Sequence, residues 1–328
     1  MEYTSSEKII EQISQYSAKF SALKFEISKV IVGHTSIIDA TLIAVLSKGH
    51  VLLEGVPGVA KTTLIKTIAD ALGLTFSRIQ FTPDLLPADL IGTLIYNPQS
   101  QEFDTKKGPV FANLVLADEI NRSPAKVQSA LLEAMQEGQV TIGSTTFQLD
   151  QPFLVFATQN PIENEGTYRL PEAQIDRFMF KLCVGYPTFE QEREILNRSC
   201  TPIQVHKIIS KDDIVQAQNI IQNVYIDPRL IEYILHIVFA TREPKKYNVS
   251  SVADLIQYGA SPRATIAITN ACKAYAFLQN RHFVIPDDIK MVARHILRHR
   301  IILTYHAQAD NINSDFIIDK IFDSIVTP

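Results

Sequence analysis

The sequence lacks the features that mark several classes of protein. Its three cysteines, Cys183, Cys200 and Cys272, are scattered and include no C-x-x-C pair, which argues against a disulfide framework or a zinc site. No apolar run approaches the roughly 18 residues that a membrane span requires. The first residues also show no basic segment followed by an apolar one, the pattern of a signal peptide. We therefore expect reduced thiols, no membrane span and a cytoplasmic location.

The chain also lacks an excess of basic residues. Its 328 residues carry a formal net charge of −4, whereas a protein dedicated to duplex DNA usually carries a clear surplus of Lys and Arg. Hydrophobic residues make up 46% of the chain, and the length is sufficient for two domains with substantial cores. The composition indicates a globular protein and argues against nucleic acid as its partner.

The most informative stretch is Val51 to Thr63, which reads VLLEGVPGVAKTT. A short apolar strand, a glycine-rich turn, Lys-Thr and a helix follow one another in the order of a phosphate-binding loop. Backbone N–H groups of such a turn and of the next helix bind phosphates, while Lys61 reaches the β- and γ-phosphates and Thr62 contacts Mg²⁺. The predicted nucleotide contacts are Gly55, Val56, Pro57, Gly58, Val59, Ala60, Lys61, Thr62 and Thr63.

Ala60 departs from the strict pattern, which has glycine directly before the lysine. If this position requires a positive φ, alanine has a steric cost there. The alternative interpretation is therefore a degenerate loop that no longer binds nucleotide.

Strands alternate with helices up to about Pro187, which predicts an α/β domain with a parallel sheet and a ligand site beyond the carboxyl ends of its strands. We expect this domain to span residues 1–187, with leading helices in 1–30, an insert of short elements at about 76–111 and a hairpin at 140–149. Residues 188–328 show only helical patterns and predict a smaller all-α domain. Its expected helices are 190–198, 212–222, 228–241, 262–278 and 286–303.

Asp118 and Glu119 follow the buried strand at 114–117. Downstream of a phosphate loop, this pair predicts that Asp118 holds Mg²⁺ through water and that Glu119 polarises the attacking water. The alternative is a pair of solvated loop carboxylates.

Five ordered motifs resemble the MoxR family of AAA+ ATPases, and the match covers about residues 32–305. They are GVPGVAKT (55–62), ADEINRSPAKVQ (117–128), ATQNP (157–161), LPEAQIDRF (170–178) and GASPRA (259–264). Alanine in place of the last loop glycine also recurs in that family. The resemblance implies an AAA+ core with a helical lid, ATP and Mg²⁺ as cofactors, and a ring that is usually a hexamer. It further implies chaperone-like remodelling of a client protein, with a von Willebrand A-domain protein as a partner type.

The resemblance also assigns roles to single residues. Asn160 matches sensor 1, which contacts the γ-phosphate or the attacking water, although an asparagine before proline can simply cap a turn. Arg177 matches the arginine finger that enters the neighbouring subunit's site, the alternative being a local pair with Asp176 or Glu172. Arg263 matches sensor 2, the alternative being an ordinary arginine in the first turn of a helix.

Three further stretches leave their interpretation open. Members of that family usually have Val-Gly-Gln near the adenine, where this chain has Val32-Gly33-His34. Val32 and His34 are therefore candidate contacts to the base. A histidine can still stack or hydrogen-bond there, but the resemblance then supports a preference for adenine less strongly. The insert and the hairpin 140–149 resemble elements that face the pore or the client, or they are surface embellishments. Five basic residues near 294–300 indicate a solvated helix face, with phosphate or partner binding as the alternative. These are Arg294, His295, Arg298, His299 and Arg300.

Two other functions are compatible with the sequence. One is a nucleotide-controlled binding module with negligible hydrolysis, which only Ala60 and His34 favour. The other is a DNA-acting motor, against which the acidic balance and the absence of a Lys/Arg stripe on the hairpin argue.

Overall fold

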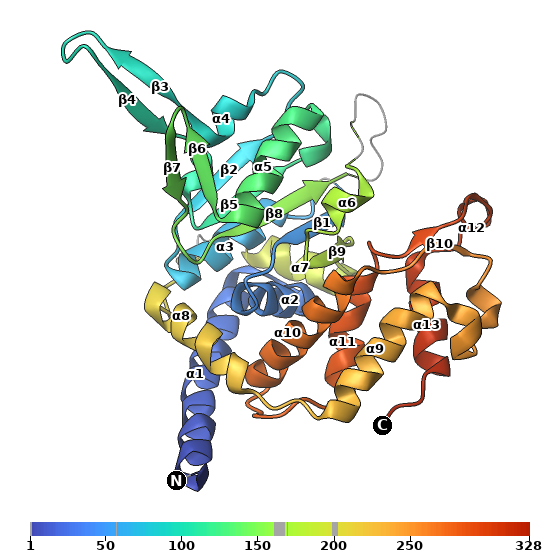
Figure 1. The fold of residues 1–328 in the computed structure, drawn as a ribbon. Coiled ribbons are helices and arrows are strands. Elements are labelled where there is room, and N and C mark those ends of the chain that lie inside the picture. The colour runs from blue at the N-terminus through green and yellow to red at the C-terminus, as the bar shows by residue number, and fades with distance from the viewer. Residues whose placement is uncertain (1, 57, 161–167, 169, 199–202) are drawn as a thin grey trace.

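The structure is a computed structural model that describes residues 2–56, 58–160, 168, 170–198 and 203–328. Three residues considered above lie outside this part of the chain, namely Pro57 of the phosphate loop, Pro161 of the ATQNP motif and Cys200. Figure 1 shows a central sheet with helices on both of its faces and a helical region below it.

Five parallel strands form the central sheet, in the order β2-β5-β8-β1-β9. This confirms the predicted parallel sheet. All five carboxyl ends therefore lie along one edge, and β1 lies between β8 and β9 rather than beside β2. The strands are β1 (Val51–Gly55), β2 (Phe76–Gln80), β5 (Leu114–Asp118), β8 (Leu154–Gln159) and β9 (Phe180–Val184).

Successive side chains of a strand point to opposite faces, and both faces of this sheet are apolar and covered. Leu52, Val115 and Val155 join one buried cluster with α4 (Pro87–Ile91) and α5 (Ala125–Glu137). Their neighbours Leu53 and Leu116 join a larger cluster on the other face, where α2 (Thr35–Leu46) and α3 (Lys61–Leu72) pack. This larger cluster continues without interruption into the helices of the second half of the chain.

The expected leading helices are one continuous helix, α1 (Glu2–Val30). Ile13, Phe20 and Ile27 recur along it at helical spacing and are almost completely buried. No proline or glycine interrupts this segment, so the helix runs through it without a break. The amino-terminal end of α1 extends away from the body of the molecule (Figure 1).

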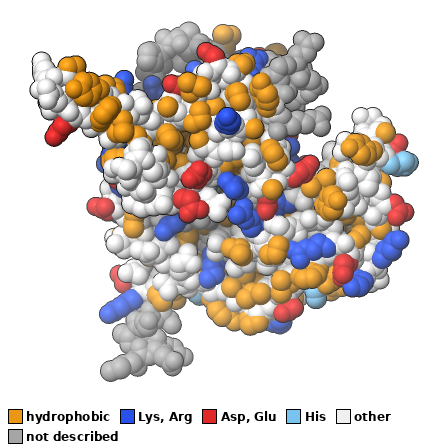
Figure 2. Space-filling view, turned by 45° about the horizontal axis from the view of Figure 1, so that its top comes forward, with side chains coloured by type: hydrophobic (Ala, Val, Ile, Leu, Met, Phe, Trp, Pro, Cys, Tyr) orange, Lys and Arg blue, Asp and Glu red, His pale blue; other side chains and the backbone are white. Residues whose placement is uncertain are grey.

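The insert contains an antiparallel hairpin that projects from the sheet (Figure 1). Its strands are β3 (Gly92–Asn97) and β4 (Glu102–Lys107), and Tyr96 and Phe103 on them are 51% and 66% exposed. Figure 2 shows hydrophobic side chains along this projection. The predicted second hairpin is confirmed as β6 (Gln139–Ile142) and β7 (Thr145–Gln148), which turn at Gly143 with φ 62°. The Leu94 side chain of β3 lies against Gly143, so the two hairpins contact each other.

The second half of the chain is largely helical, as predicted, but not entirely. Ile256–Tyr258 (β10) and Ile302–Leu303 (β11) form a small antiparallel sheet, so the expectation of helices alone is wrong, and the helix expected to reach Leu303 ends at Leu297. Among the described residues, no helix is long and apolar enough to cross a membrane. The helices are α6 (Glu172–Ile175), α7 (Phe189–Arg198), α8 (Lys211–Ile220), α9 (Pro228–Arg242), α10 (Pro262–Leu278), α11 (Pro286–Leu297), α12 (Tyr305–Ala309) and α13 (Ser314–Ser324).

Candidate functional site

The phosphate loop connects the carboxyl end of β1 to the first turn of α3. Gly58 has φ 81° and Ala60 has φ 56°, so the backbone turns through two left-handed residues before the helix begins at Lys61. The first N–H groups of a helix have no acceptor within it and therefore face the loop. This arrangement of N–H groups and helix dipole is suited to a phosphate.

Gly55 is required for a steric reason, whereas Gly58 is required for its backbone conformation. A Cβ at Gly55 would lie 2.4 Å from the backbone oxygen of Val184 on β9, whereas a Cβ at Gly58 would meet nothing within 4 Å. Gly55 therefore allows the close approach of β9, and Gly58 supplies the positive φ.

A cavity of about 420 Å³ opens above the loop. Of the predicted nucleotide contacts, Val56 packs against the larger apolar cluster instead of lining it, and Val32 and His34 also lie outside the cavity lining. Asp118, Glu119 and Asn160 come to this cavity from the ends of β5 and β8, as the sequence predicts. The full lining is Gly55, Gly58, Val59, Ala60, Lys61, Thr62, Thr63, Arg78, Gln80, Asp118, Glu119, Thr158 and Asn160.

The Lys61 ammonium group lies inside the cavity and donates to the Gly55 carbonyl at 2.5 Å. Burial lowers its pKa, and the nearby carboxylates Asp118, Glu119 and Glu54 oppose this effect. The Gly55 carbonyl therefore holds Lys61 close to the loop, and a bound phosphate could take the place of that carbonyl as the acceptor.

Asp118 is held by two neighbours that sequence reasoning missed. Thr158 donates to one carboxylate oxygen at 2.6 Å, and Arg78 donates to the other from Nη2 at 2.6 Å. Both partners extend from strands that flank β5, namely β8 and β2. Only the strand order brings them together, so no local pattern in the sequence could have identified them.

Glu119 is the second strained residue of the site, with φ 56° and ψ 50°. Its backbone N–H donates to the Thr158 hydroxyl at 2.8 Å, which fixes the turn after β5. Its carboxylate accepts from Gln80 Nε2 at 2.8 Å and pairs with Arg122 Nε at 3.2 Å. The carboxylate is thereby aimed from the end of β5 into the cavity, at a conformational cost of the kind that clusters at functional sites.

The donor set suits a metal–phosphate complex better than a bare metal ion. The described residues contain no group of three or more His, Cys, Asp or Glu that could hold a metal. Thr62 and Asp118 supply one hydroxyl and one carboxylate beside Lys61. Mg²⁺ takes few protein ligands and keeps water and phosphate oxygens as the rest, so these residues fit that ion.

The candidate base region lies at the start of α2. Val32 is buried, and His34 has φ 54° and a pKa lowered by burial. The Gln191 side chain of α7 covers Gly33, where a Cβ would lie 2.5 Å from its Nε2. Sequence reasoning missed Gln191 because it lies about 160 residues farther along the chain.

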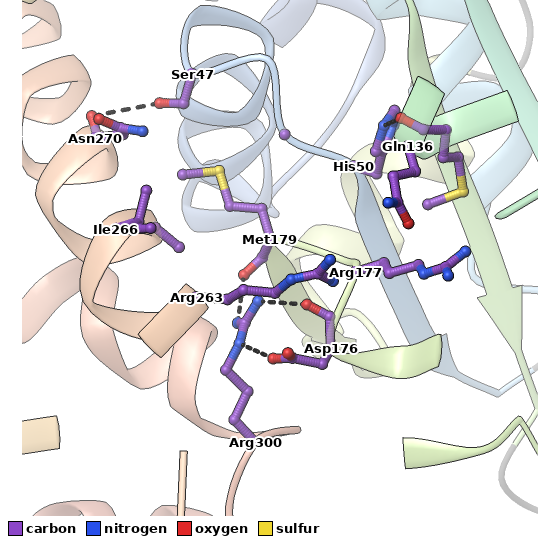
Figure 3. A pocket seen from close by; sticks show the side chains of 13 residues that line it. Ser47, His50, Gln136, Asp176, Arg177, Met179, Arg263, Ile266, Asn270 and Arg300 are labelled. Atoms are coloured by element: carbon purple, nitrogen blue, oxygen red, sulfur yellow. Dashed lines mark hydrogen bonds and ion pairs between the residues drawn. The ribbon is translucent and has the colours of Figure 1, made fainter. Parts of the chain in front are cut away.

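Arg177 and Arg263 line a second cavity, of about 250 Å³, that shares no residue with the first (Figure 3). Gly49 and His50, which directly precede β1, belong to its lining, whereas the phosphate loop follows the other end of β1. A strand of this length spans roughly 17 Å. Neither arginine side chain forms a hydrogen bond or ion pair within the part of the chain that the structure describes. The local pair of Arg177 with Asp176 is therefore absent.

Most of the basic residues near the end of α11 do not form a solvated face, and that interpretation is wrong for them, whereas Arg294 is 35% exposed and pairs with Asp319 at the surface. Arg300 is only 6% exposed, Arg298 donates to the Lys181 carbonyl at 2.9 Å, and a His299 ring nitrogen lies 2.9 Å from the Phe178 carbonyl. These three side chains face inward because α11 packs against β9, and the backbone of β9 and of the residues just before it offers carbonyl acceptors.

Comparison with known proteins agrees with this fold and site. Residues 50–180 match the model of the ATPase family associated with various cellular activities (AAA), and residues 249–321 match the AAA lid domain. A solved structure from Cytophaga hutchinsonii, described as a candidate ATPase, is 52% identical with a TM-score of 0.93 over 100% of this chain and 99% of its own. The fold and site therefore define an AAA+ protein.

Three curated relatives identify the branch of this superfamily. Chaperone MoxR1 of Mycobacterium tuberculosis is 52% identical over 93% of this chain and 81% of its own length. Protein YeaC of Bacillus subtilis is 47% identical over 92% of both chains, and protein MoxR of Paracoccus denitrificans is 30% identical over 96% of this chain and 98% of its own. The chain belongs to the MoxR family of AAA+ ATPases.

Proposed function

We propose that the protein hydrolyses ATP with Mg²⁺ at a site completed by a neighbouring copy, and that this activity remodels a client protein. The cavity above the loop supports the binding step. Its loop and helix N–H groups and Lys61 would hold the phosphates, while Thr62 and Asp118 would hold the metal, which neutralises charge on the phosphate oxygens.

Glu119 would carry the proton transfer. In this reaction the water oxygen bonds to the γ-phosphorus as the bond from that phosphorus to the bridging oxygen breaks, and the water proton passes to the Glu119 carboxylate. Asn160 at the end of β8 would orient the water or the γ-phosphate. Both side chains reach the same cavity from adjacent strands, which supports these roles.

The separation of the two cavities carries the proposal of a shared site. Arg177 and Arg263 line a cavity beyond the amino end of β1, whereas the phosphates would lie at its carboxyl end. A bound γ-phosphate in the same chain is therefore out of their reach, and the two guanidinium groups, which have no anionic partner among the described residues, are available to another copy. An arginine supplied in trans accelerates phosphoryl transfer by about 10³-fold or more in related systems.

Closure of such head-to-tail contacts produces a ring. We propose a hexamer, as expected for this family, acting in the cytoplasm. A client role is supported by the name of the relative Chaperone MoxR1 and by the exposed apolar side chains of the β3–β4 hairpin. A von Willebrand A-domain protein is the partner type that we would test first.

Steady-state ATPase activity against protein concentration tests the shared site. Specific activity should rise with concentration as rings form, and Arg177→Ala should abolish the rise. Arg229→Ala serves as a matched control, because Arg229 is an exposed arginine paired with Asp227 at the start of α9. A rate independent of both concentration and Arg177 would contradict the proposal.

A further inference from the structure

Arg300 uses every hydrogen bond that its guanidinium group can donate within its own chain. Nε donates to Asp176 Oδ1 at 2.7 Å, and Nη2 donates to the Asp176 and Phe178 carbonyls at 3.0 and 2.7 Å. Nη1 donates to the Met179 and Ile296 carbonyls at 3.1 and 2.6 Å. Five N–H groups thus meet five acceptors. Arg300 therefore has no donor left for a nucleotide and acts on the fold itself.

Four of these five acceptors belong to the segment that carries Arg177. They are the Asp176 carboxylate and the carbonyls of Asp176, Phe178 and Met179. The fifth belongs to α11, which ends just before Arg300. Figure 3 shows Arg300 reaching from the helical region to this segment, with dashed lines to Asp176 and Met179.

The other carboxylate oxygen of Asp176 faces the helix that carries Arg263. Oδ2 accepts from the Ser261 hydroxyl at 2.9 Å, and Ser261 is the N-cap of α10, accepting from the Arg263 N–H. One carboxylate is therefore bound both to Arg300 and to the cap of α10. Arg177 follows Asp176 by one residue, and Arg263 follows Ser261 by two.

We infer that Asp176, Ser261 and Arg300 are positioning residues that join Arg177 and Arg263 into one unit. The inference rests on the proposed function, because the two arginines matter only if they act on a neighbour's nucleotide. Any movement of α10 and α11 carries both guanidinium groups together. The orientation of the helical region in one copy thus sets whether the next copy receives its arginines.

A subunit-mixing experiment tests this assignment. A Lys61→Ala donor cannot use its own loop but keeps its arginines, and an Arg177→Ala acceptor keeps its loop but lacks the finger. Mixing the two should restore ATPase activity. Ser261→Ala or Asp176→Asn placed in the donor should lower the kcat of the mixture, by about tenfold for Asp176→Asn, without changing the KM for ATP. The same changes placed in the acceptor should have no effect, because the acceptor contributes only its loop.

Two controls separate positioning from loss of structure. Ser261→Ala leaves the buried Asp176–Arg300 pair intact, so this variant remains informative if Asp176→Asn does not fold. Asn313→Ala in the donor removes the same kind of cap, from α13, and should leave the mixture unchanged.

The outcomes also separate failure of this inference from failure of the proposed function on which it rests. No recovery on mixing Lys61→Ala with Arg177→Ala would overturn the shared site, and the inference with it. Full recovery that is indifferent to Ser261→Ala and Asp176→Asn in the donor would overturn the inference alone. An equal loss in donor and acceptor would also overturn it, because it would mean a structural role only.

Discussion

Arg78 binds the carboxylate of Asp118 with two donors, Nε at 3.1 Å and Nη2 at 2.6 Å from the same oxygen. Asp118 is the residue that we assign to the metal, so a cation of the protein already occupies one side of it. The Arg78 side chain is 49% exposed, and an exposed pair of this kind contributes only about 0–1 kcal/mol. Arg78 should therefore weaken metal binding slightly without preventing it.

Arg78→Gln should tighten Mg²⁺ binding by up to about fivefold, since 1 kcal/mol corresponds to roughly that factor. Calorimetric titration of Mg²⁺ into ATP-loaded protein in the Glu119→Gln background measures this directly, without turnover. Arg229→Gln, at the exposed pair with Asp227, should change nothing. Weaker Mg²⁺ binding in Arg78→Gln would mean that Arg78 supports the nucleotide complex instead of competing with the metal.

Glu119→Gln should stop hydrolysis and preserve nucleotide binding. The amide has the shape of the carboxylate but cannot take the proton of the attacking water, and loss of such a group typically costs about 10²–10⁴-fold in rate. Phosphate release and ATP binding should be measured on the same sample. Glu133→Gln, an exposed change on α5, is the control. Hydrolysis at the wild-type rate in Glu119→Gln would remove Glu119 from the mechanism.

Ala60→Gly should stabilise the protein. Alanine at φ 56° has a left-handed conformation that costs about 1–2 kcal/mol, which glycine avoids at a smaller cost in unfolded-state entropy. We expect a gain of about 0.5–1 kcal/mol in the free energy of unfolding, measured by urea titration, with ATP binding retained. Ala125→Gly, at an exposed position in the first turn of α5, should destabilise instead. A loss of stability in Ala60→Gly would mean that the alanine methyl group makes a favourable contact.

Acidification from pH 7 to 5 should destabilise the fold partly through His50. Its pKa is lowered to about 4 by burial, and its ring accepts from the Val155 N–H at 3.0 Å while facing the Met135 carbonyl at 3.1 Å. The unfolded chain takes up a proton at pH about 6.5, so His50 contributes fully above that pH and loses its contribution as the pH falls toward 4. Asp213, with a pKa of about 2, loses its contribution only below pH about 4.

The midpoint of urea unfolding at pH 7 and pH 5 measures this loss. Between pH 7 and 5, His50 alone should account for about 1.8 kcal/mol, because the slope approaches about 1.4 kcal/mol for each pH unit only below pH 6.5. His50→Gln should therefore lose less free energy of unfolding between pH 7 and pH 5 than the wild type loses, although it is less stable than the wild type at pH 7. His306→Gln, at a histidine on the surface of α12, should decrease as the wild type does. Equal decreases in all three proteins would exclude His50 as a contributor.

Local sequence patterns predicted the parts of the site that lie within one strand–turn–helix unit. The phosphate loop, the strand that ends at Asp118 and the strand that leads to Asn160 each have an apolar run followed by polar residues that line the cavity. Such runs report burial directly, because a strand covered on both faces must be apolar throughout. The parallel sheet followed from the alternation of such strands with helices, and the largely helical second half followed from its helical patterns.

Features that depend on strand order or on distant packing could not be predicted this way. Gln80 reaches Glu119 only because β2 pairs with β5, with Gln80 opposite Asp118. The strands β10 and β11 are three and two residues long, too short to show a period of two. The charge of Arg300 suggests a residue exposed to solvent, and four of its five acceptors lie more than 120 residues earlier in the chain.

The bonds from Arg300 to the backbone around Phe178 also limit how this chain could be recombined with its relatives. The sequence suggests a domain junction near Pro187, and a hybrid protein joined there would exchange the whole helical half with that of a relative. The imported arginine would then face carbonyls of a different backbone, and each N–H group left without an acceptor would be a buried unsatisfied donor. The helical half and residues 176–184 therefore form one exchangeable unit, and a functional hybrid has to take both from the same protein.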